Sequence, residues 1–124
     1  VLDGSQNAII AFDAVRNTTG QIVDFRYVLQ NEANRQRVGR PDDVLLGRTM
    51  LEFFPDVATS GLLEKYARVV ETGEPLRFEL EFTYRGEPGW YDYAVLKRGD
   101  GMVMTVHDKT TERRNQVLET MLET

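Results

Sequence analysis

Residues 31–55, NEANRQRVGRPDDVLLGRTMLEFFP, contain three short helical segments that are separated by helix-stopping residues. Asn31 can cap the first helix through its side-chain oxygen, and Gly39 can end that helix in a left-handed conformation. Thr49 is a second N-cap candidate, and Pro55 prevents the third helix from continuing. Helices this short have little core of their own, so we expect them to form a cover over another part of the chain.

Segments with strand character lie on both sides of this stretch. Residues 8–12 form a short apolar run, and residues 22–29 alternate between apolar and polar side chains after a turn at 17–20. Residues 62–71 place apolar side chains at helical spacing opposite charged ones, which predicts one amphipathic helix. The stretch therefore connects two strands to a longer helix.

After that helix, apolar and polar residues alternate along the chain, as is typical of strands. We predict strands at 76–84, 90–97 and 102–106, joined by turns at 85–89 and 98–101. The middle strand carries apolar groups on both faces, so we expect helices on one face and a terminal helix or a second copy of the chain on the other. The predicted fold class is α+β, a five-stranded antiparallel sheet with short helices on one face and a C-terminal helix.

Composition limits the class of protein. The chain has 124 residues, of which 41% are hydrophobic and 10% aromatic, enough for one domain with one core. A formal net charge of −5 without a dense basic run argues against nucleic acid or a membrane surface as a partner. No apolar run approaches the ~20 residues of a membrane span, and the first residues lack the pattern of a signal peptide. The lack of cysteine is compatible with the cytoplasmic location that we expect.

The order of these elements resembles the PAS domain, and the resemblance extends from residue 1 to about residue 115. Its motifs are Ile9-Ile10-Ala11-Phe12-Asp13, Asn31-Glu32-Ala33, Leu46-Gly47-Arg48 before Phe53-Phe54-Pro55, and Asp108-Lys109-Thr110-Thr111-Glu112-Arg113. The last motif departs from the family, because Lys109 replaces the usual Ile and an extra Thr is present. That departure puts a buried contact in doubt.

The resemblance implies a sensory or interaction domain at residues 1–109, followed at 110–124 by the start of an outgoing signalling helix. Such a domain relays a change in ligand or dimer state to an output domain of the same chain, of the histidine kinase or cyclase type. The sequence leaves one alternative open, a structural dimerisation module without a ligand. Neither role makes this segment an enzyme.

Candidate pocket residues lie on the predicted inner sheet face and on the helices that cover it. They are Phe25, Tyr27, Phe53, Tyr66, Val69, Phe78 and Leu80. In a domain of this size most such residues are core, and the identity of any small-molecule ligand stays unknown. Family members that bind flavin covalently need a pocket cysteine, so the resemblance excludes that cofactor. It also argues against haem, because residues 62–71 contain no axial histidine.

A metal site and acid–base catalysis are two further possibilities. His107 is the only histidine, and without a second histidine or a cysteine we expect no metal site. Glu79 and Glu81 occupy alternate positions of one predicted strand, and Asp92 could lie across from them. The alternation places these carboxylates on the polar outer face, where a solvated charge is the ordinary state. We therefore expect no catalytic residues here.

The expected signal junction consists of Asp108, Thr110 and Arg113. Asp or Thr before a helix satisfies its first N–H groups, so these residues could also be ordinary caps without a switching role. The following helix carries an apolar stripe made of Val117, Leu118, Met121 and Leu122. A short helix is marginal in water, so this stripe needs either the same helix of a second chain, in a homodimer, or the domain's own sheet.

Overall fold

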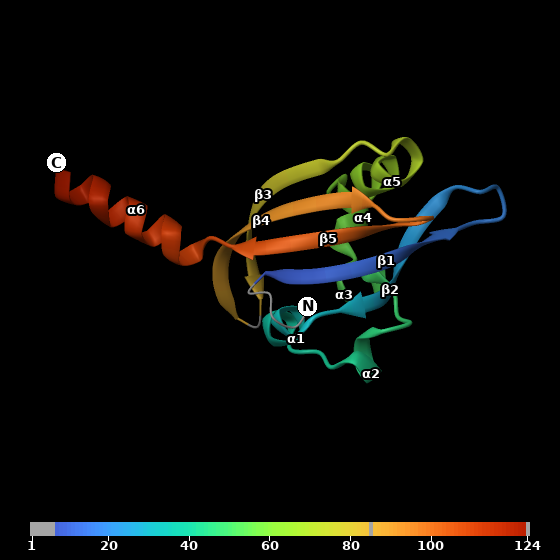
Figure 1. Ribbon diagram of the computed structural model, residues 1–124, viewed down its shortest axis with the longest axis horizontal. Helices are drawn as coiled ribbons and strands as arrows, with labels where there is room; N and C mark the ends of the chain where they lie inside the picture. The colour runs from blue at the N-terminus through green and yellow to red at the C-terminus, as the bar shows by residue number, and fades with distance from the viewer. Residues whose placement is uncertain (1–6, 85, 124) are drawn as a thin grey trace.

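The computed structural model describes residues 7–84 and 86–123. Within these residues one antiparallel sheet of five strands has the order β2-β1-β5-β4-β3 (Figure 1). The strands are β1 (Ala8–Arg16), β2 (Ile22–Gln30), β3 (Leu76–Tyr84), β4 (Glu87–Lys97) and β5 (Gly101–Asp108). The first strand, β1, pairs with the last strand, β5, so the sheet needs both the N-terminal and the C-terminal strands to form. The predicted α+β fold class is confirmed.

Helices cover one face of this sheet. They are α1 (Glu32–Val38), α2 (Asp42–Leu45), α3 (Met50–Phe53), α4 (Asp56–Thr59) and α5 (Leu62–Thr72). The first helix contacts β1, the next two contact an edge strand, β2, and α5 crosses beneath β2, β3, β4 and β5 (Figure 1). The last helix, α6 (Thr110–Glu123), extends away from the end of the sheet. Among the described residues, no helix combines the length and apolar character that crossing a membrane requires.

The predicted beginnings of α1 and α3 are confirmed. Asn31 Oδ1 accepts a hydrogen bond from Asn34 N at 3.1 Å, and Gly39 ends α1 with a φ of 71°. Thr49 and Glu52 form a reciprocal capping box, in which Thr49 N donates to Glu52 Oε2 at 2.6 Å. Local capping chemistry therefore accounts for the length of these two helices.

The turn between α2 and α3 is attached to the sheet edge. Gly47 N donates to Tyr27 O at 2.9 Å, and Tyr27 N donates to Arg48 O at 2.9 Å. Gly47 has a φ of 86°, a left-handed conformation that glycine adopts without steric strain. These two bonds join the short helices to β2, so the cover is fixed at that edge.

One additional helix and two strand boundaries differ from the sequence prediction. The helix α4 follows Pro55 directly, because the fixed φ and missing N–H of proline suit the first turn of a helix. β1 continues beyond residue 12 to Arg16 in a hairpin with β2. β4 already begins at Glu87, and Pro88 is tolerated because its pairing with Thr83 precedes the pairing of β4 with β5. The predicted turn residue 85 lies outside the described residues, as do residues 1–6 and 124 of the two predicted segments.

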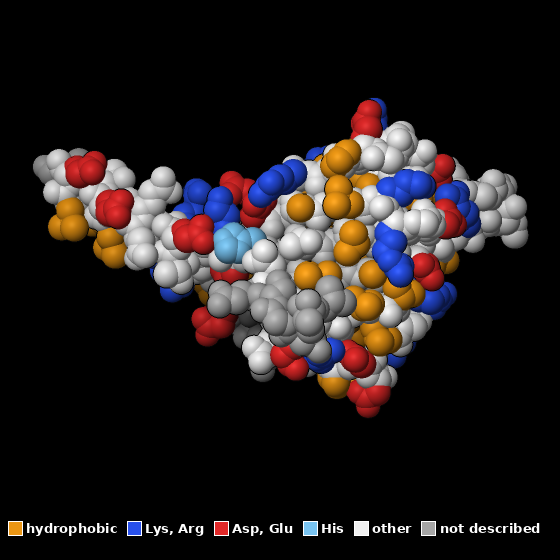
Figure 2. Space-filling model, in the orientation of Figure 1, with side chains coloured by type: hydrophobic (Ala, Val, Ile, Leu, Met, Phe, Trp, Pro, Cys, Tyr) orange, Lys and Arg blue, Asp and Glu red, His pale blue; other side chains and the backbone are white. Residues whose placement is uncertain are grey.

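The outer sheet face is only partly covered. Leu96 is 51% exposed and pairs in register with Val103 of β5. Figure 2 shows apolar side chains spread over this face and at the end of α6. No described side chain of α6 is buried, so this helix does not fold back over the sheet, which was one of the two alternatives.

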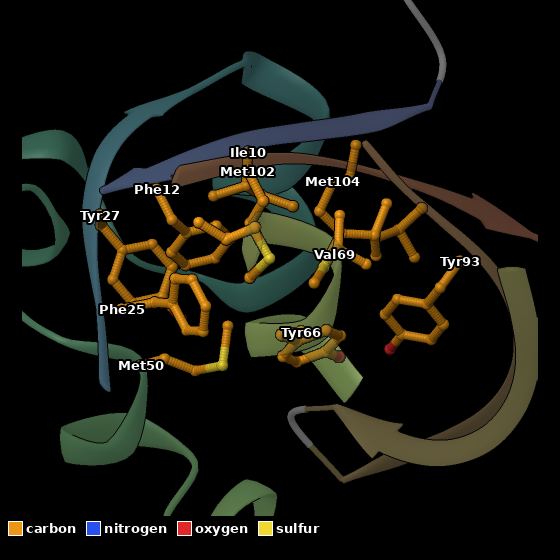
Figure 3. Packing of buried hydrophobic residues seen from close by; sticks show 14 of the residues in the cluster. Ile10, Phe12, Phe25, Tyr27, Met50, Tyr66, Val69, Tyr93, Met102 and Met104 are labelled. Carbon is orange, nitrogen blue, oxygen red and sulfur yellow. The ribbon is translucent and has the colours of Figure 1, made fainter. Parts of the chain in front are cut away.

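The hydrophobic core lies between the inner sheet face and the helices (Figure 3). The Phe12 and Tyr27 rings are 4.6 Å apart between centroids, and the Phe12 and Phe25 rings meet edge-on at 6.3 Å. Met50 from α3 and Met102 from β5 pack beside these rings. These rings lie toward β1 and β2, Tyr93 lies at the other end of the cluster, and Tyr66 lies between them.

Candidate ligand cavity and signal junction

A cavity of about 440 Å³ lies between the inner sheet face and its helical cover. This volume is within the range of roughly 300–1,000 Å³ that is typical of small-molecule sites. Its wall is formed by residues from all five strands and from each of the helices α1 to α5. The aromatic part of the wall consists of Phe12, Tyr27, Phe53, Phe54, Tyr66, Phe82 and Tyr93.

The structure divides the predicted pocket residues into two groups. The cavity is lined by Tyr27, Phe53, Tyr66 and Leu80. The core beside it contains Phe25, Val69 and Phe78. Phe25 is 0% exposed and meets Tyr66 edge-on at 6.2 Å, and Phe78 stacks on Tyr93 at 4.8 Å. Alternation along a strand indicates which face a residue occupies, but it does not indicate where packing leaves a space.

Charged side chains that are not among the predicted pocket residues also reach the cavity. They are Arg37, Arg40 and Asp56. Arg37 Nη2 donates to Asn34 Oδ1 at 2.8 Å, and the Arg40 guanidinium lies 4.4 Å from the centroid of the Phe53 ring. Asn34 is only 1% exposed, and its spacing from Arg37 places both on one face of α1. That spacing is the signal that could have identified Arg37.

A buried glutamine holds the loop that carries Arg40. Gln30 is 6% exposed, and its Nε2 donates to Arg40 O at 3.0 Å and to Asp42 Oδ1 at 2.9 Å. Its Oε1 accepts from Asn34 Nδ2 at 2.7 Å. The hydrogen bond from Gln30, followed by the one from Arg35, lowers the pKa of Asp42 and keeps this carboxylate charged. The backbone at Arg40 is therefore fixed relative to the cavity wall.

The predicted junction residues gather around Trp90 of β4. Thr110 N donates to Asp108 Oδ1 at 2.9 Å, while Trp90 N donates to Thr110 Oγ1 at 3.1 Å. Lys109 N donates to Trp90 O at 2.8 Å, and the Arg113 guanidinium lies 3.8 Å from the centroid of the Trp90 ring. The strand position of Trp90 follows from sequence, but its contact with the junction does not, because the two are distant in the chain.

Two further side chains attach the beginning of α6 to the domain. His107 Nδ1 is 2.9 Å from Asn7 Oδ1, and His107 Nε2 is 2.9 Å from Glu112 Oε1. Lys109, the departure from the family motif, forms an ion pair with Glu79 of β3 at 2.7 Å. The lysine side chain is thus held to the sheet by a salt bridge.

Comparison with known proteins assigns the family. Residues 22–115 match the family model described as the PAS fold. This chain belongs to the PAS family. No curated protein sequence matches it. PAS domains are in general sensory, non-catalytic modules.

Solved structures of other PAS domains have the same fold. A PAS domain from Colwellia psychrerythraea has 16% identity and a TM-score of 0.64, over 89% of this chain and 92% of the other. A domain of a sensory box sensor histidine kinase/response regulator from Geobacter sulfurreducens has 21% identity and a TM-score of 0.62, over 85% and 84%. The photoactive yellow protein domain of the sensor histidine kinase Ppr from Rhodospirillum centenum has 20% identity and a TM-score of 0.58, over 86% and 94%.

Two of the three predicted outer-face carboxylates of this PAS domain, Asp92 and Glu79, form ion pairs. Arg77 Nη2 donates to Asp92 Oδ2 at 2.8 Å, and this bond lowers the pKa of Asp92. Glu79 is paired with Lys109, and Glu81 is exposed. A general acid at neutral pH needs a raised pKa, so the Asp92 environment does not suit that role.

The predicted dimer seam of the PAS domain lies on α6, away from the cavity. Val117 is 55% exposed, Leu118 56%, Met121 66% and Leu122 86%. The structure brings these four residues together on the projecting helix and leaves them in contact with solvent. Figure 2 shows apolar side chains near the end of this helix.

Proposed function

We propose that this PAS domain senses a small molecule in its cavity and transmits cavity occupancy to an output domain through α6. One observation carries the proposal: the cavity wall includes Tyr93 of β4, the strand whose Trp90 contacts the beginning of α6. The same strand thus contacts both the sensing site and the outgoing helix. The domain corresponds to residues 1–109, and residues 110–124 begin the outgoing helix.

The transmission step is a shift between two packings of β4 and α6. A ligand that contacts Tyr93 or Leu80 favours the position of β3 and β4 that accommodates it. Movement of Trp90 changes its contacts with Thr110 and Arg113, and with them the angle of α6. Asp108 contributes by holding the first N–H of this helix.

The output domain that we infer belongs to the same polypeptide and is of the histidine kinase or cyclase type. The sensor histidine kinase domains among the similar structures support the kinase. The proposal places the domain in the cytoplasm beside that output domain.

We also propose a homodimer in which the seam residues of two α6 helices meet. The exposed stripe of Val117, Leu118, Met121 and Leu122 supports it, because pairing would remove apolar surface from water. The same stripe supports the alternative of a ligand-free dimerisation module. The cavity favours the sensor, since a purely structural module has no need of one.

Native mass spectrometry of full-length protein purified from its own cells tests this function. We expect a dimer mass with a bound small molecule. Val57→Trp should abolish the bound mass by filling the cavity, because Val57 lines it from α4. Val44→Trp is the matched control, because Val44 is 42% exposed on α2 and does not line the cavity. A wild-type protein without bound mass, or a bound mass that survives Val57→Trp, would contradict the sensor.

A further inference from the structure

The charged side chains that line the cavity are mostly positive. Its charged lining residues are Arg37, Arg40 and Asp56, two guanidinium groups against one carboxylate, although the whole chain has a formal net charge of −5. The rest of the wall is almost entirely aromatic and aliphatic. We propose that the cavity takes a small organic anion, a planar carboxylate joined to an aromatic body. This inference rests on the proposed function, because it names the class of molecule that the domain senses.

The aromatic wall suits a flat apolar body. The Tyr27 and Phe53 rings meet edge-on at 6.0 Å, and the Phe54 and Phe82 rings at 6.1 Å. All four rings line the cavity, so their faces and edges can contact a further ring in the offset or edge-on arrangements that aromatic pairs prefer. A body of this kind would remove apolar wall from water without placing a polar atom against it.

Arg40 is positioned to bind a carboxylate. Its guanidinium lies over Phe53 at 4.4 Å and over Phe54 at 6.0 Å. A guanidinium that lies over a ring presents its N–H groups outward in its own plane, and these form parallel hydrogen bonds with a planar carboxylate. Because Gln30 holds the Arg40 backbone, the side chain begins from a fixed point. An anion bound here would meet donors already oriented by the fold.

The charge of Arg40 is not neutralised by a neighbouring carboxylate. Arg35 is paired with Asp42 at 3.1 Å, and Arg48 with Glu52 at 3.1 Å. Among the described residues, by contrast, Arg40 makes no salt bridge, and its contacts are with the two phenylalanine rings. The partly apolar surroundings weaken screening by water, which strengthens attraction between this cation and an anionic ligand.

Arg37 provides a second cationic group in the same wall. Its guanidinium is oriented by the bond from Nη2 to Asn34 Oδ1 at 2.8 Å and lies 6.0 Å from the Tyr91 ring centroid. Asn34 is itself held by Gln30 at 2.7 Å. One buried hydrogen-bonded network, Gln30 with Asn34, therefore supports both arginines. The two guanidinium groups add positive charge to a cavity wall that is otherwise mostly apolar.

A matched pair of probes tests the ligand class on the 124-residue chain. 2-Naphthoate and 2-naphthamide share one ring system, but only the first carries a charge. Isothermal titration calorimetry should show that 2-naphthoate binds at least about tenfold more tightly than 2-naphthamide, because hydrogen bonds to a charged partner contribute more than neutral ones. Raising the salt concentration should reduce this preference.

Arg40→Gln should remove most of the preference, lowering the affinity for 2-naphthoate about tenfold while the affinity for 2-naphthamide stays nearly constant. Arg114→Gln removes an exposed arginine of α6 outside the cavity and should change neither affinity. Equal binding of the two probes by the wild-type chain would overturn the ligand class and leave the sensor intact. Failure of both probes would also overturn the class, whereas the sensor itself is decided separately by the native mass measurement.

Discussion

At the scale of single residues, Asn31 joins the first strand to the cover of the cavity. Its side chain is 0% exposed. Oδ1 accepts hydrogen bonds from Ile9 N at 2.9 Å and from Asn34 N at 3.1 Å, and Nδ2 donates to Asn7 O at 2.8 Å. One amide thus satisfies backbone groups of β1 and of α1. The residue is both a helix cap and a tertiary contact.

Asn31→Ala should lower the free energy of unfolding by about 2–4 kcal/mol, because it removes a cap and leaves a second backbone N–H without its acceptor. Urea denaturation followed by circular dichroism measures this quantity. Asn115→Ala, at an exposed position of α6, is the control and should change it little. An equal effect of the two substitutions would contradict the stabilising role of the Asn31 hydrogen bonds.

The predictability of a residue depends on how local its role is. The capping role of Asn31 follows from its place before a helical pattern, because the N–H that it accepts lies within the same turn. Its contact with Ile9 depends on the sheet and could not be predicted from the neighbouring sequence. Arg40 is similar, since its position over Phe53 results from the packing of α3 against the loop.

At the scale of elements, the pairing of β1 with β5 leaves no space for a side chain at Gly101. A Cβ atom at Gly101 would lie 1.9 Å from the backbone oxygen of Phe12. No real Cβ atom approaches so closely, so the two strands can pair in this register only with glycine. The pairing sets the position of Met102 and Met104, the next inward residues of β5.

Gly101→Ala should therefore reduce the free energy of unfolding by about 3 kcal/mol, because the neighbouring backbone has to move. Gly99→Ala in the preceding turn is the matched comparison. Gly99 has a φ of 56° and open space around it, so only backbone strain of about 1 kcal/mol is expected there. Chemical denaturation of both variants decides the point, and a cost at Gly101 no larger than that at Gly99 would contradict the described register.

Element types were easier to predict than their ends. The alternating strand over 76–84 and the helix over 62–71 follow from side-chain period, which is a property of each segment alone. The end of β1 and the beginning of β4 depend on how far a partner strand continues, which a single segment does not encode. The helix α4 was missed because Pro55 was interpreted only as a stop, although proline also suits a helix start.

At the scale of the whole molecule, the strand β4 connects the cavity with the beginning of the outgoing helix. Tyr93 contacts the cavity and Trp90 contacts the beginning of α6. The direction of α6 could not be predicted from sequence, because it depends on contacts between residues that are distant in the chain. Figure 1 shows that this direction carries the helix away from the sheet.

The central claim is that cavity occupancy reaches α6, and amide hydrogen exchange tests it most directly. The 124-residue chain is compared with and without saturating 2-naphthoate. The account predicts altered protection in the cavity wall and also at Lys109 and Arg113, whose N–H groups donate to Trp90 O and Lys109 O. Protection that changes only in the cavity wall, with exchange at Lys109 and Arg113 unaltered, would contradict it.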